Sequence, residues 1–301
     1  MKKDTTDEEL FEQKVERLIK ISNDNPLLPE SFVPWDTKLD DYHKLMPDSL
    51  LSLYGSPFFD ELTPTQKREL SRAEIAQVMY SYAWSEELAC LFFFRYVSSL
   101  KDITSAKCRY VMKEIEEETR HMQMFSMAIT KLGVQPLPPR RMHRFAAWLA
   151  TTLLPSDVMF MSVLAIELVT DVYGDELRSQ EDIFPVLAKI SQLHNIEEGR
   201  HIHFAELLLK RYIEKAGLIK RSIYSIVVCL NIYFMRTMYV RKEIFKNIGV
   251  DPKRYYKPAY GGLKYKFSQH CLKRATKFVS SFNGFNWFTK LFWRSFLGTK
   301  F

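Results

Sequence analysis

Two nearly identical pentapeptides constrain the fold of this chain more than any other feature. The sequence reads EETRH at residues 117–121 and EEGRH at residues 197–201. In each copy a histidine follows a glutamate by three positions, and residues three apart share one face of an α-helix. The repeat therefore predicts two helices that each present a Glu-x-x-His pair to a common interior.

The remaining sequence also favours helices. Most of the thirteen prolines fall within residues 26–64 and 136–155, and the long stretches between them are rich in helix-forming residues. We predict an all-α bundle of domain size, with an N-terminal helix and wrapping arm at 1–62, the bundle at 63–250 and a basic aromatic segment at 251–301. Its helices are expected at about 64–100, 104–132, 141–153, 156–178, 183–215 and 219–248.

On the helix of the second pentapeptide, three side chains that suit a metal ion leave in one sector. They are His194, Glu198 and His201, which are spaced by four and three residues. Arg200 belongs to the opposite side, together with Lys189 and His203, and we expect that side to face water.

The helix of the first pentapeptide divides its acids between two faces. Glu118 and His121 share a stripe with apolar neighbours and point inward. Glu116 with Arg120, and Lys113 with Glu117, have the i, i+4 spacing of exposed ion pairs. We therefore assign Glu116 and Glu117 to the surface.

Two further glutamates lie on strongly apolar helices. Glu167 is the only charge in residues 158–170, and an ionised carboxylate there needs a metal ion or an arginine, or else must be protonated. Glu86 interrupts the apolar stripe formed by Ile75, Met79, Tyr82 and Phe93, whereas Glu87 is turned to the flank. Glu86 is thus the preferred fourth carboxylate, with Glu87 as the alternative.

These residues make four carboxylates and three imidazoles on four helices, all directed inward. Two Glu-x-x-His pairs plus one glutamate from each of two other helices match a ferritin-like site for two iron or manganese ions. Carboxylates bridge and neutralise two cations, imidazoles complete each ion, and open positions admit oxygen. The predicted metal ligands are Glu86, Glu118, His121, Glu167, His194, Glu198 and His201.

With these motifs the sequence resembles the di-iron arylamine N-oxygenases, a family that includes para-aminobenzoate N-oxygenase. The resemblance covers roughly residues 35–255 and includes the flanking stretches LTPTQKREL and YVRKEIFKNIGVD. Most ferritin-like oxygenases have two histidine ligands, whereas this family adds a third, one turn before the second Glu-x-x-His. His194 matches that third ligand.

The resemblance implies an enzyme with two irons, or one iron and one manganese, that uses O₂ and an external electron donor. A diferric peroxo species would transfer oxygen to a small-molecule substrate, an aromatic amine in the best-known members. His121 and His201 would each hold one iron, His194 would join one of them, and two glutamates would bridge. Arg120, Arg200 and Asp171 either support these ligands or, for the arginines, lie on the surface.

Other functions stay open at this point. A di-iron hydroxylase or desaturase of a lipid or tRNA base, a ferritin-like storage or peroxide-scavenging protein, and a membrane adaptor with a vestigial site share the same ligands. The third histidine favours an oxygenase, because ferritin-type centres are poor in histidine. Six side chains either line a substrate pocket or belong to the ordinary core: Tyr82, Cys90, Phe93, Phe125, Phe160 and Leu164.

The C-terminal part of the chain differs from the rest in net charge. Residues 210–301 hold 20 Lys and Arg against 3 Asp and Glu, whereas residues 1–209 hold 23 against 33. Bases and aromatic residues alternate through 253–301, which suits anionic membrane lipids or RNA. The alternative is a tail that packs on the acidic body of its own chain or of a homodimer mate.

Composition also bears on location. The four cysteines are far apart, the chain starts with charged residues, and the apolar run at 222–235 is too short to span a membrane. We expect a cytoplasmic protein, with peripheral membrane contact left open.

Overall fold

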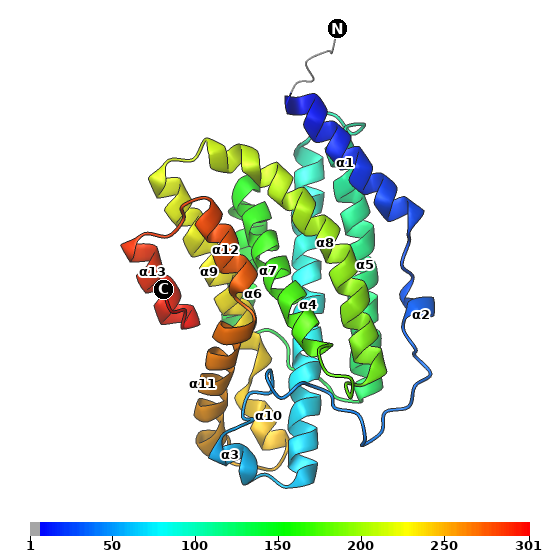
Figure 1. Ribbon diagram of the computed structural model, residues 1–301, viewed down its shortest axis with the longest axis vertical. Helices are drawn as coiled ribbons and strands as arrows, with labels where there is room; N and C mark the ends of the chain where they lie inside the picture. Colours follow the sequence, from blue (N-terminus) through cyan, green and yellow to red (C-terminus); the bar gives the residue numbers. More distant parts are fainter. Residues whose placement is uncertain (1–6) are drawn as a thin grey trace.

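The computed structural model describes residues 7–301, and these residues are organised in helices (Figure 1). Within that range the only β-type pairing is an isolated bridge between Lys44 and Ile183. The charged start of the chain and part of the predicted N-terminal unit, residues 1–6, lie outside the described residues. The all-α prediction is confirmed.

Four long helices form the centre of the molecule. They pack as two hairpins, α4 with α5 and α7 with α8, and α5 also contacts α8. Each hairpin carries one pentapeptide, so the contact between α5 and α8 brings the two copies face to face. The helices are α4 (Pro64–Ser99), α5 (Ala106–Leu132), α7 (Ser156–Leu177) and α8 (Pro185–Glu214).

The ends of these helices follow local sequence rules. Thr63 caps α4 by accepting a hydrogen bond from the Gln66 amide, and the Gln66 side chain accepts one from the Thr63 amide. Gly133 ends α5 in the left-handed conformation, with φ of 63°. The two ends lie where the sequence predicts them.

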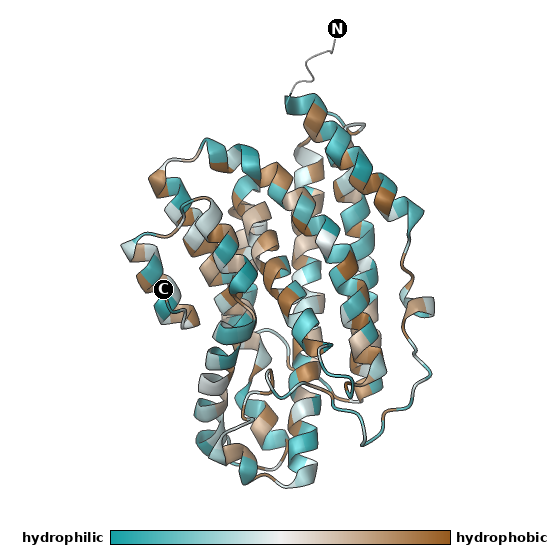
Figure 2. Ribbon diagram, in the orientation of Figure 1, coloured by the Kyte–Doolittle hydropathy of each residue, from teal (hydrophilic) through white to brown (hydrophobic). Residues whose placement is uncertain are grey.

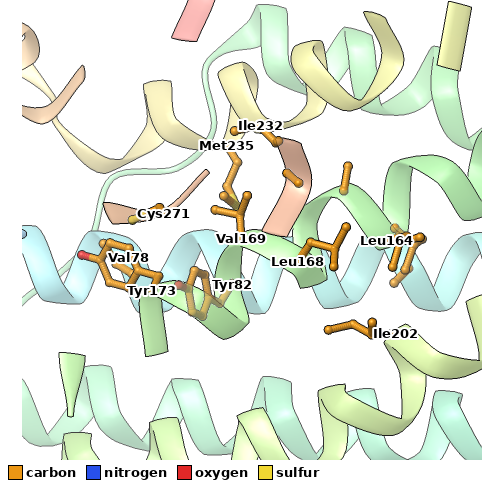
Figure 3. Packing of buried hydrophobic residues seen from close by; sticks show 14 of the residues in the cluster. Val78, Tyr82, Leu164, Leu168, Val169, Tyr173, Ile202, Ile232, Met235 and Cys271 are labelled. Carbon is orange, nitrogen blue, oxygen red and sulfur yellow. The ribbon is translucent and has the colours of Figure 1, made fainter. Parts of the chain in front are cut away.

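Helix α7 forms the middle of the core. Most of its side chains are buried, which explains why its sequence is apolar on every face. Figure 2 shows hydrophobic residues concentrated along it. In Figure 3, side chains of α4, α7 and α9 (Leu218–Tyr239) meet between the helices, among them Tyr82, Leu168 and Met235.

The long apolar helix predicted to reach residue 248 is broken near its end. Val240 is extended, and Arg241 donates to the carbonyl of Pro138 at 3.0 Å, so α9 stops and α10 (Lys242–Asn247) begins after the break. By length and composition the stretch Leu218–Asn247 could cross a membrane. The 18 most apolar residues of this stretch are 61% buried inside the protein. The core helix of a folded protein can have the same length and composition.

The N-terminal part wraps the bundle. Helix α1 (Asp7–Asp24) packs on α5 and α8, and its Glu12 accepts the Ala106 amide at 2.8 Å. The arm that follows contains two four-residue helices, α2 (Pro29–Phe32) and α3 (Pro57–Asp60).

The C-terminal part forms three helices that pack on the body. They are α11 (Pro252–His270), α12 (Lys273–Ser281) and α13 (Trp287–Leu297). Arg274 pairs with Asp171, Lys266 donates to the carbonyls of Asp48 and Leu51, and Trp293 donates to Ser225. Some of the basic charge of this segment is therefore used within the chain.

Adjacent glycines in α11 give a matched test of this packing. A Cβ on Gly262 would lie 2.2 Å from the carbonyl oxygen of Ser52, whereas a Cβ on Gly261 would meet nothing within 4 Å. We expect Gly262→Ala to lower the free energy of unfolding by about 1–3 kcal/mol, because backbone cannot yield easily. Gly261→Ala should raise it by up to about 1 kcal/mol, because alanine favours a helix. Chemical denaturation measures both, and equal effects would contradict the close packing.

Candidate metal centre

The seven predicted ligands converge in two groups of buried donor atoms. One group contains Glu86, His121, His194 and Glu198, and within it the donor atoms lie within 4.8 Å of one another. A second group with the same spacing consists of Glu118, Glu167, Glu198 and His201. Glu198 belongs to both groups. The arrangement is that of two adjoining ion positions with a shared carboxylate.

The two Glu-x-x-His pairs form the middle of the centre. The Nδ1 atom of His121 lies 2.8 Å from a carboxylate oxygen of Glu118 and 3.5 Å from one of Glu198. His201 Nδ1 lies 3.2 Å from the other oxygen of Glu118 and 3.6 Å from the other oxygen of Glu198. Glu118 and Glu198 thus lie between the two imidazoles, where a bridging carboxylate is needed.

His194 and Glu86 close one end of the centre. His194 Nε2 lies 3.2 Å from Glu86 and 3.1 Å from Glu198. The imidazole is stacked on Tyr82 and meets the edge of Phe125, so its orientation is fixed by packing. Glu86 is buried and Glu87 is exposed, in line with the preference for Glu86 as the inward acid.

Glu167, at the other end, has no cationic partner among the described residues, so the alternative of an internal arginine pair is not realised. Its Oε2 atom is buried without a hydrogen-bond partner. Glu118 Oε1, both oxygens of Glu198 and His201 Nδ1 lie at ion-pair distance from imidazole or carboxylate atoms of the centre but form no hydrogen bond. Buried oxygens and nitrogens without partners are costly, and cations between them would remove that cost. The donor set therefore fits a pair of metal ions.

The shifted pKa values of the centre also indicate that its carboxylates require positive charge. Burial and the charge of Glu118 raise the pKa of Glu86 to about 7. Burial lowers the pKa of His121, but hydrogen bonds to Glu118 and Glu197 outweigh it and raise the value to about 10. Without metal, protons supply part of the positive charge that the carboxylates require, and metal loading must displace them.

The first glutamate of each pentapeptide holds the histidine of the other. His201 Nε2 lies 2.8 Å from Glu117, and His121 Nε2 lies 2.8 Å from Glu197. The prediction that Glu117 forms an exposed pair with Lys113 is wrong, because the Glu117 side chain crosses to α8 and is buried. Lys113 pairs with Glu116 instead, at 2.9 Å. We call the two contacts Glu117–His201 and Glu197–His121 the crossed pairs.

The arginines of both pentapeptides neutralise the crossed pairs. Arg200 lies 3.0 Å from Glu117 and 3.4 Å from Glu197, and Arg120 lies 3.1 Å from Glu197. Arg200 was expected to face water, but it is only 8% exposed, because it must reach the buried carboxylates. Burial raises the pKa of Glu117, but its contacts with His201 and Arg200 outweigh burial and lower it to about 2.

Asp171 has a different partner from the one considered for it. Its carboxylate pairs with Arg274 of α12, and its carbonyl accepts a hydrogen bond from Asn195 at 2.8 Å. The described residues show no hydrogen bond from Asp171 to a metal-facing imidazole.

A cavity of about 320 Å³ adjoins the centre, and both Glu86 and Glu167 line it. Its walls come from α4, α7, α9 and α6 (Arg141–Leu153). The six side chains considered for a pocket all belong to the core instead. On α4 the lining face contains Ser85, Leu88, Ala89 and Phe92, which the sequence did not single out.

Comparison with known proteins identifies the family. Residues 8–282 match the family model described as p-aminobenzoate N-oxygenase AurF, a wider range than the 35–255 expected. Uncharacterized proteins of Mycobacterium tuberculosis (Rv0885) and Mycobacterium bovis (Mb0909) are each 28% identical over 155 residues. That match covers 50% of this chain and 43% of each relative, so the chain spans less than half the length of these relatives.

The family match extends over most of the chain and includes every residue of the centre. Its fold is the ferritin-like helical bundle, and its chemistry is that of di-iron oxygenases. The chain belongs to the p-aminobenzoate N-oxygenase AurF family.

Proposed function

We propose that this protein is an O₂-dependent di-iron oxygenase that N-oxygenates an aromatic amine. The observation that carries the proposal is the pair of donor groups that share Glu198 beside an apolar cavity. His121, His194 and Glu86 would hold one iron with Glu198, and His201 and Glu167 would hold the other. Glu118 and Glu198 would bridge.

Two irons, when bound, would supply the reduction of O₂ and the transfer of one oxygen atom. The balanced first oxidation is R–NH₂ + O₂ + 2 e⁻ + 2 H⁺ → R–NHOH + H₂O. One oxygen atom forms the new N–O bond, and the other leaves as water. An external donor must provide the two electrons.

The side chains of the protein would have three tasks in this reaction. Glu117 and Glu197 would accept hydrogen bonds from the Nε2–H groups of His201 and His121, which would leave both Nδ1 atoms free to hold the irons. Apolar walls keep water from the reacting atoms. The cavity reaches the centre at Glu86 and Glu167, so an amine bound there would lie beside the irons.

The decisive experiment is anaerobic loading with Fe(II), followed by exposure to O₂ and a reductant with an arylamine present. We expect about two irons per chain and an arylhydroxylamine that carries label from ¹⁸O₂. Iron uptake far above two per chain, without product, would point to storage instead. Oxidation at carbon only would point to a hydroxylase.

Glu86 and Glu87 provide a matched test of the ligand set. Glu86→Ala removes a buried oxygen from the first donor group, so we expect iron affinity to fall by at least tenfold. Glu87→Ala changes an exposed neighbour and should leave affinity unchanged. Anaerobic titration against a competing chelator measures both variants, and the reverse ranking would reject Glu86 as a ligand.

The crossed pairs can be tested separately from the ligands. Glu117→Gln keeps the shape of the side chain but removes the charge that faces His201 and Arg200. We expect iron affinity to fall about 10–100-fold, the range for loss of a supporting hydrogen-bond partner. Glu116→Gln is the control, because Glu116 is exposed and its ion pairs within residues 7–301 are with Lys113 and Arg120. Equal affinity in the two variants would refute a supporting role for Glu117.

A further inference from the structure

The cavity beside the metal centre has a composition that restricts its ligand. Small and apolar side chains make most of its wall, including Ala146, Ala147 and Ala150 of α6 and Val227 of α9. Glu86 and Glu167 are its charged lining residues, and both belong to the metal centre. Within residues 7–301 no lysine or arginine lines it.

Arg95 lies close to the cavity, but its side chain bonds to backbone carbonyls of the protein. The guanidinium of Arg95 donates to the carbonyls of Thr151 and Leu154 at the end of α6. It is not a lining residue, although Leu154 is. The positive charge of Arg95 therefore stabilises a helix end and is not presented to a ligand.

The few polar groups of the wall suit an uncharged ligand. Asn231 donates to Ser162 at 3.1 Å and to the carbonyl of Val227 at 2.9 Å, so its amide N–H groups are used. The Nε2 of His143 lies 2.8 Å from the Thr237 hydroxyl, and its buried Nδ1 has no hydrogen-bond partner. One ring nitrogen thus remains for a neutral polar group.

We propose that the substrate is an uncharged, mainly apolar amine that lacks a carboxylate. This inference rests on the proposed function, because it places the amino group at Glu86 and Glu167. The far end of the molecule would then contact the apolar wall. A carboxylate at that end would be buried without a cation, which costs several kcal/mol. The p-aminobenzoate of the family's name carries such a carboxylate, so this chain has a different specificity.

Binding to the metal-free protein tests the inference independently of oxygenation. The probes are 4-aminobenzoate, which is an anion at pH 7, and its neutral methyl ester, compared by isothermal titration calorimetry. We expect the ester to bind at least tenfold more tightly. Equal or tighter binding of 4-aminobenzoate, or no binding of either probe, would overturn the proposal. Failure of the oxygenase function would appear only in the iron experiment.

Two neighbouring residues locate the binding site. Ala147→Trp fills the cavity and should abolish binding of the ester. Trp148→Ala alters a residue that is 57% exposed and does not line the cavity, and it should leave binding unchanged. Unaltered binding to a folded Ala147→Trp variant would show that the probe binds elsewhere.

A second observation concerns the outer face of α6. Large apolar side chains on this helix face solvent, with exposed fractions between 41% and 69%. They are Met142, Phe145, Trp148, Leu149 and Leu153. The helix contains no acidic residue, and Arg140, Arg141 and Arg144 form no ion pair within residues 7–301. Wide exposure of apolar side chains indicates an interaction surface.

The same surface continues onto two other helix starts. Leu218 and Ile219 at the start of α9 are about four-fifths exposed, and they share a surface hollow with Pro155, which follows α6. Asn286 donates to Ser222 at 2.7 Å, which holds the start of α13 there, and the next residue, Trp287, is 80% exposed.

From this surface we infer that the protein docks on an anionic lipid bilayer. Apolar and aromatic side chains of α6, α9 and α13 would enter the interface, and the unpaired arginines at the start of α6 would contact lipid phosphates. Charge complementarity favours this partner, because three unpaired cations lie at the start of α6, a helix without acidic residues. Within the segment 253–301, considered above for membrane contact, α13 supplies the exposed aromatic residues Trp287 and Phe288.

Co-sedimentation with vesicles tests the docking. We expect binding to phosphatidylcholine vesicles that contain 30% phosphatidylserine, weaker binding in high salt, and little binding to phosphatidylcholine alone. The double variant Phe145→Ser/Trp148→Ser should bind at least fivefold less. Tyr42→Ser, which removes an exposed aromatic residue from the N-terminal arm, is the control. Absence of vesicle binding, or a dimer in solution that the double variant dissociates, would overturn the proposal.

Discussion

The burial of charge at the centre of the bundle governs the rest of the structure. Four carboxylates and three imidazoles lie in an interior formed by apolar helices, and several of their atoms have no hydrogen-bond partner. Such a cluster is costly unless positive charge completes it. Helix α7 offers no cation near Glu167, and the two arginines of the pentapeptides contact the outer carboxylates. The interior is therefore arranged for cations that come from outside the chain.

Much of this could be predicted from the sequence, because helical geometry is local. The spacing of His194, Glu198 and His201 fixes a common face whatever the rest of the chain does. Glu167 is recognisable because a lone charge in an apolar helix needs an explanation. Helix ends at Thr63 and Gly133 depend on capping rules that operate within a few residues. The all-α class and the positions of the main helices follow from such signals.

The features that could not be predicted depend on contacts between helices. Glu117 has a suitable exposed partner on its own helix, so spacing alone assigned it to the surface. Its actual partners, Arg200 and His201, lie on α8, and only the packing of α5 against α8 shows this. The cavity has the same origin, because its wall combines four helices whose relative rotation no single segment encodes.

The crossed pairs make the two halves of the centre interdependent. Each imidazole is oriented by a glutamate on the helix that carries the other imidazole. Each arginine pairs with a carboxylate of the opposite hairpin. A small sliding of α5 along α8 would therefore misalign both ion positions together. Occupancy of the first position would fix the alignment that the second requires. Uptake of iron should thus be cooperative, and partly filled preparations should contain mostly empty and fully loaded molecules.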